Sequence, residues 1–495
     1  MQTRTFKAGV LAFGAALTVG AGLISSAVLA RLLTPHDYGT FRQTLLVFLV
    51  AGPVLSMGLP NALSYFLPGE ARRPRAVLYE NILLLVALGV GFGIFLLAGG
   101  NRLIARGLGN PDLVTTLAIM APYAMVNLPW GSFSTCLMVS GRAMSFTIVN
   151  VLGRLLLLAC VLIPCVYWRS AEAALVGTVF SAALVMVPAF VLMIRSCQGA
   201  EVTPGWPGMK AQLAYAGPLT IASIFGTLSI TFDKIIVSTL CDPATFAVYA
   251  NGAMELPITG IVTGAATAVL LPEMAALYKR GQTREMLDLW KRSAVKCAVV
   301  IAPAMAGLLV LAPQFIRLLY SSKYVESTLP FIIYLLVLPG RVVTYHAIFM
   351  AAGRNGALCL RSVITLAANV VISVALVTRF GYLGAAVGAV LALYLCEIPL
   401  YLHGIRRVLQ VKSDPLLPYR DMARIFAGSF VAAVPVAALA HWCPLADLPM
   451  FLVGGGLYAM LAALVMQWLG YLDLRAVLLR WRAVRRAGPA QERDR

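Results

Sequence analysis

The chain has 495 residues, of which 60% are hydrophobic and only 12% are charged, and its formal net charge is +19. Its mean hydropathy is +0.86. A soluble domain has about 25% charged residues and a lower apolar fraction, so this composition excludes a soluble protein and indicates one that crosses the membrane many times.

Windows of about 20 mostly apolar residues, the length at which a helix spans a bilayer, predict the transmembrane segments. The sequence contains fourteen such windows, at residues 9–31, 43–66, 77–98, 113–137, 145–167, 173–194, 213–239, 246–271, 294–313, 328–350, 357–378, 383–403, 422–441 and 449–469. Apolar runs this long and continuous exclude a β-barrel. The predicted fold class is an all-α integral membrane protein with about fourteen transmembrane helices.

Lys and Arg residues are distributed unevenly over the segments between these spans. With the N-terminus placed inside, the N-tail, every second loop and the C-tail carry most of them, and the remaining loops carry few. Basic residues collect on the cytoplasmic side of membrane proteins, so the pattern predicts that both termini are cytoplasmic. The basic excess is then a topology signal, and no nucleic-acid partner is predicted.

A charged turn, RLLTPHDYGTFR from Arg31 to Arg42, separates the first two spans. A weaker copy, TLCDPATFAVYA, occupies residues 239–250, and MVSGRAMSF at 138–146 similarly matches MAAGRNGAL at 350–358. The copies lie six spans apart, an even number, so they share one orientation in the membrane. The pattern predicts two parallel six-helix lobes around a central cavity, followed by two extra C-terminal helices.

The predicted domain organisation follows from this repeat. Its parts are an N-lobe at 1–194, a cytoplasmic linker at 195–212, a C-lobe at 213–403, spans 13 and 14 at 404–470, and a basic cytoplasmic tail at 471–495. Within the tail, residues 473–486 place their apolar side chains on one helical face and arginines on the rest. This pattern predicts an interfacial helix that anchors the tail to the inner leaflet.

Span 2 contains helix-breaking residues near its middle. Pro53 and Pro60 lie in this one span, together with Gly52 and Gly58. Prolines inside a helix bend or break it, so we expect span 2 to be bent at this position.

Ionisable side chains inside the spans are the strongest functional signal, because charge is costly in lipid. Arg154 lies in span 5, one turn after Asn150, and Arg341 lies near the middle of span 10. A buried arginine needs an anion, which is either a carboxylate of this chain, such as Glu255 or Glu397, or an anionic group of a ligand. We favour the ligand for both arginines, since the planar guanidinium binds phosphate well and the two lie in different predicted lobes.

Four more charged residues are candidates for the substrate cavity. Asp233 and Lys234 are neighbours in span 7, so on a helix they diverge by about 100° and do not both face one partner. They form either a structural pair or part of the cavity, and the sequence favours neither. Arg31 and Arg42 at the outer boundary would add positive potential to a cavity that opens outward.

Two carboxylates, Glu255 and Glu397, also lie inside the predicted spans. Glu255 precedes Pro257 in span 8 and is the candidate for coupling to a driving ion, although a fixed pair with Lys234 or an arginine is the alternative. Glu397 lies near the end of span 12, and we expect it to pair with Arg406 and Arg407 a few residues later.

Motifs for catalysis, cofactors and metals are absent from the sequence. The nine cysteines form no CxxC, and the four histidines have no metal-ligand spacing. There is neither a phosphate-binding P-loop nor a nucleophile elbow. The sequence therefore predicts no catalytic residue, no cofactor and no metal site, and it predicts that the cysteines are reduced packing residues.

Fourteen spans together with three segments carry a family resemblance. The segments are ARLLTPHDYGTF at 30–41, GLPNALSYFLP at 58–68 and FDKIIVSTL…DPATFAVYANG at 232–252. In these features, over nearly its whole length, the chain resembles the bacterial polysaccharide flippases, the Wzx-type O-antigen and exopolysaccharide translocases of the multidrug/oligosaccharidyl-lipid/polysaccharide exporter superfamily. The resemblance implies two six-helix lobes around a cationic cavity. The family's acidic-basic pair at the start of a lobe maps onto Asp233 and Lys234.

Two related branches fit less well. The related peptidoglycan-precursor flippases carry an Arg-Asp pair in span 1. At the corresponding positions this chain has Ser25 and Ser26. Drug exporters often place a carboxylate in their early spans, and span 1 here has none.

The resemblance implies a transporter and not an enzyme. It would move an undecaprenyl-pyrophosphate-linked oligosaccharide across the bacterial inner membrane by alternating access, for lipopolysaccharide or exopolysaccharide biosynthesis. Its partners would be the lipid-linked glycan, membrane lipids, a polysaccharide polymerase and a chain-length regulator. Two alternatives stay open: a cation-coupled multidrug or small-metabolite antiporter that uses Glu255, and a membrane-embedded glycan polymerase or ligase, which the short outer loops oppose.

Overall fold

The computed structural model describes residues 4–69, 73–197, 203–411, 415–443 and 445–473. Over these ranges the chain is all-helical and contains no β-strand, which confirms the predicted fold class. The predicted interfacial helix at 473–486 lies, apart from its first residue, outside the described residues.

The helices correspond closely to the predicted spans. By length and composition, eleven described helices are able to cross a membrane, or thirteen if each of two bent helix pairs counts as one span. The first window lies within the helix Arg4–Leu32, in which Leu17–Leu32 is a shorter apolar stretch. The protein is therefore a multi-pass membrane protein, and the count of fourteen spans stays a prediction.

The chain divides into two compact units. The first consists of Met1–Met254, Tyr320–Pro330 and Cys359–Ala392. Its helices are α1 (Arg4–Leu32), α2 (Pro35–Ser56), α3 (Leu59–Gly69), α4 (Pro74–Phe95), α5 (Asn101–Gly107), α6 (Leu113–Ile119), α7 (Tyr123–Asn127), α8 (Pro129–Val139), α9 (Ala143–Trp168), α10 (Ala171–Ser196), α11 (Trp206–Leu240), α12 (Pro243–Gly252), most of α19 (Asn355–Phe380), and α20 (Tyr382–Ala392). A π-helix, Leu96–Gly100, joins α4 to α5, and a 3-10 helix covers Ser322–Ser327.

The second unit consists of Glu255–Leu319, Phe331–Leu358 and Leu393–Arg495. Its helices are α13 (Pro257–Lys279), α14 (Thr283–Val310), most of α15 (Ala312–Tyr320) and of α16 (Thr328–Leu335), α17 (Leu338–Arg341), α18 (Tyr345–Ala351), α21 (Ile398–Leu409), α22 (Tyr419–Trp442) and α23 (Asp447–Trp468), with a π-helix at Leu393–Glu397. The predicted domain boundaries, including the linker at 195–212, stay a prediction.

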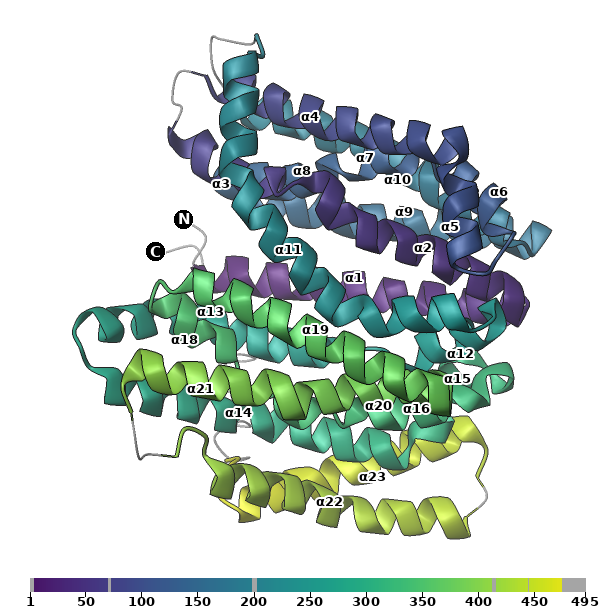
Figure 1. Ribbon diagram of the computed structural model, residues 1–495. Helices are drawn as coiled ribbons and strands as arrows, with labels where there is room; N and C mark the ends of the chain where they lie inside the picture. The colour runs from purple at the N-terminus through teal and green to yellow at the C-terminus, as the bar shows by residue number, and fades with distance from the viewer. Residues whose placement is uncertain (1–3, 70–72, 198–202, 412–414, 444, 474–495) are drawn as a thin grey trace, which may run out of the picture. The chain divides into compact units, whose positions relative to one another are not determined.

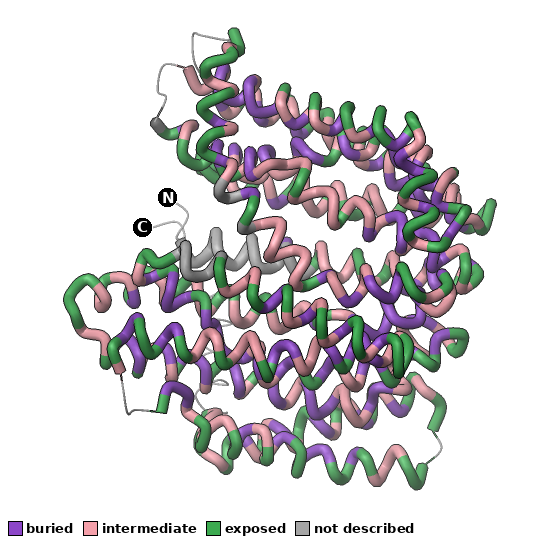
Figure 2. The backbone as a smooth tube through the Cα atoms, in the orientation of Figure 1, coloured by how far each residue is buried: buried purple, intermediate pink, exposed green. Residues whose placement is uncertain are grey.

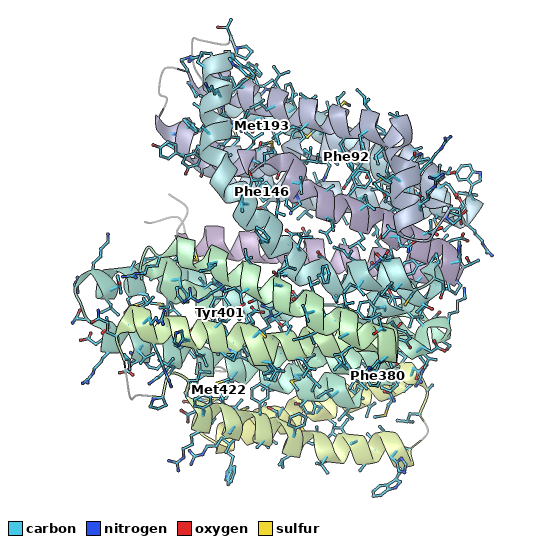
Figure 3. The ribbon with its side chains drawn as sticks, in the orientation of Figure 1. Phe92, Phe146, Met193, Phe380, Tyr401 and Met422 are labelled. Atoms are coloured by element: carbon cyan, nitrogen blue, oxygen red, sulfur yellow. The ribbon has the colours of Figure 1, made fainter. Side chains whose placement is uncertain are left out.

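Apolar side chains from several helices form the core of the first unit. One cluster joins α3, α4, α8 and α10, and Phe146 of α9 packs against it beside Met193 of α10 (Figure 3). The Sγ atoms of Cys136 and Cys197 lie 3.5 Å apart within this cluster, and both thiols are free and buried. Their surroundings agree with the predicted packing role.

In the second unit α14, α22 and α23 pack together. Tyr458 of α23 contacts Gly307 of α14, and its hydroxyl donates a hydrogen bond to the Ser429 carbonyl of α22 at 3.4 Å. Arg317 of α15 forms an ion pair with Asp447 at the start of α23, with an N–O distance of 2.6 Å. Along these helices, buried and exposed positions alternate as one face packs inward and the other faces outward (Figure 2).

The two copies of the repeated turn have the same local structure. Each ends a long helix, then places one extended residue as N-cap and a proline at the first helical position. Thr34 caps α2 by accepting from the Asp37 N–H at 3.1 Å, and Asp242 caps α12 by accepting from the N–H groups of Ala244 and Thr245 at 2.9 and 3.0 Å. A capping side chain followed by proline is a strong helix start, so sequence and structure agree here.

Hydrogen bonding at the second cap affects the acid Asp242. Burial alone would raise the pKa of this carboxyl group, but hydrogen bonds from the Thr245 hydroxyl and from the backbone of Thr245 and Ala244 lower the pKa below its ordinary value. The cap is therefore charged at neutral pH and complements the positive end of the α12 dipole.

These two turns also pack directly on each other in the first unit. The Tyr38 hydroxyl of α2 donates to Asn251 Oδ1, after the second turn, at 2.9 Å. A Cβ atom added to Gly39 would overlap the carbonyl of Pro243. The absence of a side chain at Gly39 thus lets the backbones of α2 and α12 approach closely.

The matched segments at 138–146 and 350–358 also have the same local backbone geometry. Gly141 and Gly353 both have left-handed backbones, with φ of 73° and 69°. In each turn the next residue closes the helix end: the Arg142 N–H bonds the Leu137 carbonyl at 2.8 Å, and the Arg354 N–H bonds the Phe349 carbonyl at 2.9 Å. This is the glycine-terminated helix end in which glycine supplies the positive φ.

Span 2 is interrupted in the region where its prolines and glycines predict a bend. Helix α2 ends at Ser56 and α3 begins at Leu59. The two residues between them, Met57 and Gly58, have φ of 46° and 64°. The break lies just before Pro60, which has no N–H to bond the carbonyl of Ser56, four residues earlier and the last residue of α2.

Gly39→Ala tests the contact between the turns. We expect it to destabilise the purified protein by about 1–3 kcal/mol, because the new methyl group overlaps the Pro243 backbone. Gly91→Ala is the control, a helical glycine of α4 in the same unit, since no atom lies within 4 Å of a Cβ added there. It should leave the melting temperature unchanged or raise it, because alanine favours the helix. Equal melting temperatures for the two variants would show that the turns are not in contact.

Candidate functional site

Arg154 lies on α9 in the first unit, beside a pocket of about 330 Å³. Three neighbouring helical segments supply its walls, each through residues at positions i, i+3, i+4 and i+7. They are Tyr123, Val126, Asn127 and Trp130 of α7 and α8, Asn150, Gly153, Arg154 and Leu157 of α9, and Thr178, Ser181, Ala182 and Val185 of α10. Because this spacing puts side chains on one helix face, all three segments turn one face toward the same space.

A bent pair of helices forms one wall of the pocket. The fourth predicted span is interrupted after Ile119 and continues from Tyr123, and the two parts are bent by 44°. The segment after the bend carries Tyr123, Asn127 and Trp130 toward the pocket, while α8 and α9 both pack against α10 (Figure 1).

Polar groups of the pocket wall keep capacity for a ligand. The Thr178 hydroxyl donates to the Ala174 carbonyl at 2.9 Å, and the Ser181 hydroxyl donates to the Thr178 carbonyl at 2.9 Å. With their protons used in this way, both hydroxyl oxygens keep acceptor capacity, and that of Thr178 is the more accessible, since Ser181 is only 1% exposed. Asn150 donates through Nδ2 to Thr18 Oγ1 at 3.0 Å, which leaves its amide oxygen as a further acceptor.

Arg154 is exposed and is one of the residues that line this pocket. Within the part of the chain that the structure describes, no carboxylate lies within 4.0 Å of it. An arginine inside a membrane span requires an anionic or polar partner, so the geometry leaves that position to a ligand or to water in the pocket. Of the two alternatives for Arg154, the structure supports the ligand-facing one.

Arg341 has the opposite surroundings in the second unit. Its NH1 lies 3.3 Å from Glu397 Oε1, and its NH2 lies 4.0 Å from Glu255 Oε1. Arg341 is thus flanked by two carboxylates of its own chain. This geometry supports the fixed ion pair as its role, and a contact with substrate stays a prediction.

All three members of this charge cluster lie at helix interruptions. Glu255 is in the non-helical segment between α12 and α13, Arg341 ends the short helix α17, and Glu397 ends a π-helix. Helix interruptions of this kind recur at the ion and substrate sites of transporters. Glu255 is also the most open of the three, with 52% of its side chain exposed.

The expected local pair of Glu397 with Arg406 and Arg407 is wrong. The structure pairs this carboxylate with Arg341, 56 positions earlier in the sequence. Arg406 and Arg407 instead occupy the last turn of α21, where their charge complements the negative end of the helix dipole.

Asp233 and Lys234 differ in their surroundings, as expected for neighbours on one helix. Asp233 is only 2% exposed and accepts a hydrogen bond from the Tyr249 hydroxyl of α12 at 2.7 Å. Lys234 is half-buried. Asp233 therefore joins α11 to the repeated turn, which favours a structural role over a place in the substrate cavity for this residue. A cavity role for Asp233 or Lys234 stays a prediction.

Arg42 also bonds to the repeated turn. Its guanidinium donates to the Ala250 carbonyl at 3.2 Å and to Ser26 Oγ at 3.5 Å, and it lies 5.9 Å from the centre of the Tyr38 ring. Arg31 is exposed, and its backbone carbonyl accepts from Lys323 Nζ at 3.2 Å. Their predicted contribution to an outward-open cavity stays a prediction.

The sequence pointed to Arg154 and Asn150 but not to the other polar and aromatic residues that line the pocket. The signal was present: Tyr123, Asn127 and Trp130 share one helix face, and Thr178 and Ser181 share another. Neutral polar residues are common in spans, so only their convergence on Arg154 marks them. Among the described residues, no group of three or more His, Cys, Asp or Glu side chains is placed to hold a metal ion.

Comparison with known proteins places the chain in a family. A family model described as polysaccharide biosynthesis protein matches residues 28–329, more than half of the chain. The chain belongs to this family. The matched residues include both repeated turns, the Arg154 pocket, and Glu255 of the charge cluster.

Curated relatives agree with this membership. The lipopolysaccharide biosynthesis protein WzxC of Escherichia coli (strain K12) is 23% identical over 339 residues, which are 64% of this chain and 63% of WzxC. The probable lipid II flippase MurJ of Rhizobium meliloti (strain 1021) is 28% identical over 239 residues, 47% of this chain and 44% of that protein. The chain therefore aligns with less than two thirds of the length of these relatives.

Solved structures show the same fold. The lipid II flippase MurJ in an inward closed conformation matches with a TM-score of 0.72 at 14% identity, covering 94% of this chain and 99% of that one. A multidrug resistance MATE family transporter of the MOP superfamily, facing inward, matches with a TM-score of 0.60 at 19% identity, covering 82% and 96%. The predicted resemblance to Wzx-type members of this superfamily is confirmed.

Proposed function

We propose that this protein is a flippase that moves a lipid-linked oligosaccharide, carried on undecaprenyl pyrophosphate, across the membrane by alternating access for polysaccharide biosynthesis. Family membership and the transporter folds of the structural neighbours support a transporter rather than an enzyme. The observation that carries the proposal is the Arg154 pocket, a guanidinium inside a span that faces polar and aromatic walls and has no carboxylate neighbour among the described residues.

The physical need for such a site is clear. A sugar pyrophosphate carries many hydroxyl groups, which cost several kcal/mol each when they enter hydrocarbon without partners, and negative charges, which cost far more. Amide and hydroxyl groups in a pocket replace the water around the sugars, and a cation replaces the water around an anionic group. The apolar lipid carrier needs no such help and can stay in the bilayer.

The charged residues receive different roles in this proposal. Arg154 binds substrate, whereas Arg341 binds substrate only in a state in which its pairs with Glu397 and Glu255 open. Glu255 is the ion-coupling residue, since it is half exposed and its oxygen lies 4.0 Å from Arg341. The remaining candidates for the substrate path are Lys234, Asp233, Arg31 and Arg42.

Location and partners follow from the same proposal. The protein would lie in the bacterial inner membrane with both termini in the cytoplasm, as the distribution of basic residues indicates. It would receive its substrate from glycosyltransferases on the inner face. It would deliver the product to a polysaccharide polymerase and a chain-length regulator.

One observation favours a second candidate function. The half-exposed Glu255 beside Arg341 also fits a cation-coupled antiporter for drugs or small metabolites, and a multidrug transporter shares the fold. A membrane-embedded glycan polymerase or ligase has no such support from the geometry.

Deleting the gene tests the proposal. We expect lipid-linked oligosaccharide to accumulate in the inner leaflet, measured by its resistance to a glycan-modifying reagent that does not cross the membrane. Re-expression of the wild-type protein should restore the accessible pool. Normal surface glycan together with new sensitivity to toxic cations would contradict a flippase and favour the antiporter.

A further inference from the structure

We infer that the Arg154 pocket is a subsite for a single acidic sugar residue of the glycan, whose carboxylate binds the Arg154 guanidinium while the pyrophosphate binds elsewhere. The inference rests on the proposed function, since it names the part of the substrate that enters this pocket. The size, the charge and the wall chemistry of the pocket each support it.

Size limits the ligand to one sugar residue. At about 330 Å³ the pocket is near the lower end of the range for small-molecule sites, roughly 300–1,000 Å³. All of its lining residues belong to the first unit. A chain of several sugars with its pyrophosphate and lipid does not fit such a space, whereas a monosaccharide at a branch or an end of the glycan does.

Charge distinguishes a carboxylate from a pyrophosphate. Among the described residues that line the pocket, Arg154 is the one charged side chain. One guanidinium matches one carboxylate in charge and binds both of its oxygens through two parallel hydrogen bonds. A pyrophosphate carries more negative charge and many more acceptor oxygens, and the pocket wall offers no second cation to balance them.

Wall chemistry matches a sugar ring around that carboxylate. Trp130 and Tyr123 provide aromatic faces with one polar atom each, which suit the C–H faces of a pyranose. Of the two hydroxyl residues in the wall, Ser181 is only 1% exposed, whereas Thr178 is 6% exposed and its oxygen is left to accept from a sugar hydroxyl, because its own proton is bonded to a backbone carbonyl. Asn127 also lines the pocket, and its amide group can both donate and accept.

The test compares three probes on the purified full-length protein, in a detergent without a sugar head group. The probes are methyl glucuronide, methyl glucoside and inorganic pyrophosphate, and binding is measured by saturation-transfer NMR titration. We expect methyl glucuronide to bind in the millimolar range, at least tenfold more tightly than methyl glucoside, and pyrophosphate not to displace it.

Variants assign that preference to the named residues. Arg154→Gln should remove the tenfold preference for the glucuronide, and Arg154→Lys should keep part of it, because lysine keeps the charge without the planar fork. Trp130→Ala should weaken both sugars alike. Arg195→Gln is the control, an arginine in the last turn of α10 away from the pocket wall, and should bind all probes as the wild type does.

Two results would overturn the inference. One is equal binding of the glucuronide and the glucoside, and the other is displacement of the glucuronide by pyrophosphate at Arg154. Either would leave the proposed flippase function standing if the deletion strain still accumulates inner-leaflet glycan. Conversely, a deletion strain with normal glycan distribution would remove the flippase function whatever the pocket binds.

Discussion

Arg154→Gln is expected to reduce translocation of lipid-linked glycan at least tenfold without changing the amount of folded protein. Arg154 meets no carboxylate of its own chain among the described residues, so the substitution leaves no protein charge without its partner. What is lost is the bond to substrate. A charge-assisted hydrogen bond contributes about 1.5–3 kcal/mol, which corresponds to a factor of roughly 10 to 160.

The measurement is complementation of the deletion strain, with surface glycan and inner-leaflet lipid-linked glycan quantified for each variant at equal expression. Arg195→Gln serves as the control, since it removes an arginine from α10 outside the pocket wall. If Arg154→Gln supports wild-type export, the pocket is not on the substrate path. If it lowers the amount of folded protein instead, Arg154 has a structural partner.

Arg341→Gln is expected to act on stability first. Removing one partner of a buried ion pair typically costs 3–5 kcal/mol, because the other charge is left alone. Here the side chains of Arg341 and Glu397 are 36% and 20% exposed, so water screens part of the loss. We expect about 1–3 kcal/mol, which for a chain of 495 residues corresponds to a fall in melting temperature of roughly 1–3 °C in detergent.

A double variant separates a fixed pair from a substrate contact. Arg341→Gln combined with Glu397→Gln should recover most of the lost melting temperature, because neither charge is then left without its partner. Arg406→Gln is the control, since that arginine is exposed at the end of α21 and should not change the melting temperature. Additive losses in the double variant would show that Arg341 and Glu397 do not depend on each other, and would return Arg341 to the set of substrate-binding candidates.

Much of the fold could be predicted because it depends on local chemistry. The length of each apolar run sets the position of a helix, and the Thr34-Pro35 and Asp242-Pro243 pairs set where the next helix begins. Gly141 and Gly353 end helices through a backbone angle that few other residues adopt. Each of these signals acts within a few residues, so the sequence displays it directly.

Partners of the charged residues could not be predicted in the same way. Glu397 lies close in sequence to Arg406 and Arg407, yet it pairs with Arg341, because tertiary packing brings α17 beside the π-helix that Glu397 ends. The sequence shows that a buried arginine needs an anion but not which one is near. For the same reason the sequence treated Arg154 and Arg341 alike, and only the structure separates a guanidinium in an open pocket from one between two carboxylates.

The most direct test is translocation by the purified protein alone. Vesicles would contain the protein and a polyprenyl-pyrophosphate-linked oligosaccharide labelled in the inner leaflet, with an imposed ion gradient or membrane potential. A glycan-cleaving enzyme outside the vesicles would then report the fraction that reaches the outer leaflet. The account predicts that this fraction rises with time in protein-containing vesicles and stays low in protein-free vesicles. An accessible fraction that is the same with and without the protein, under each gradient applied, would contradict it.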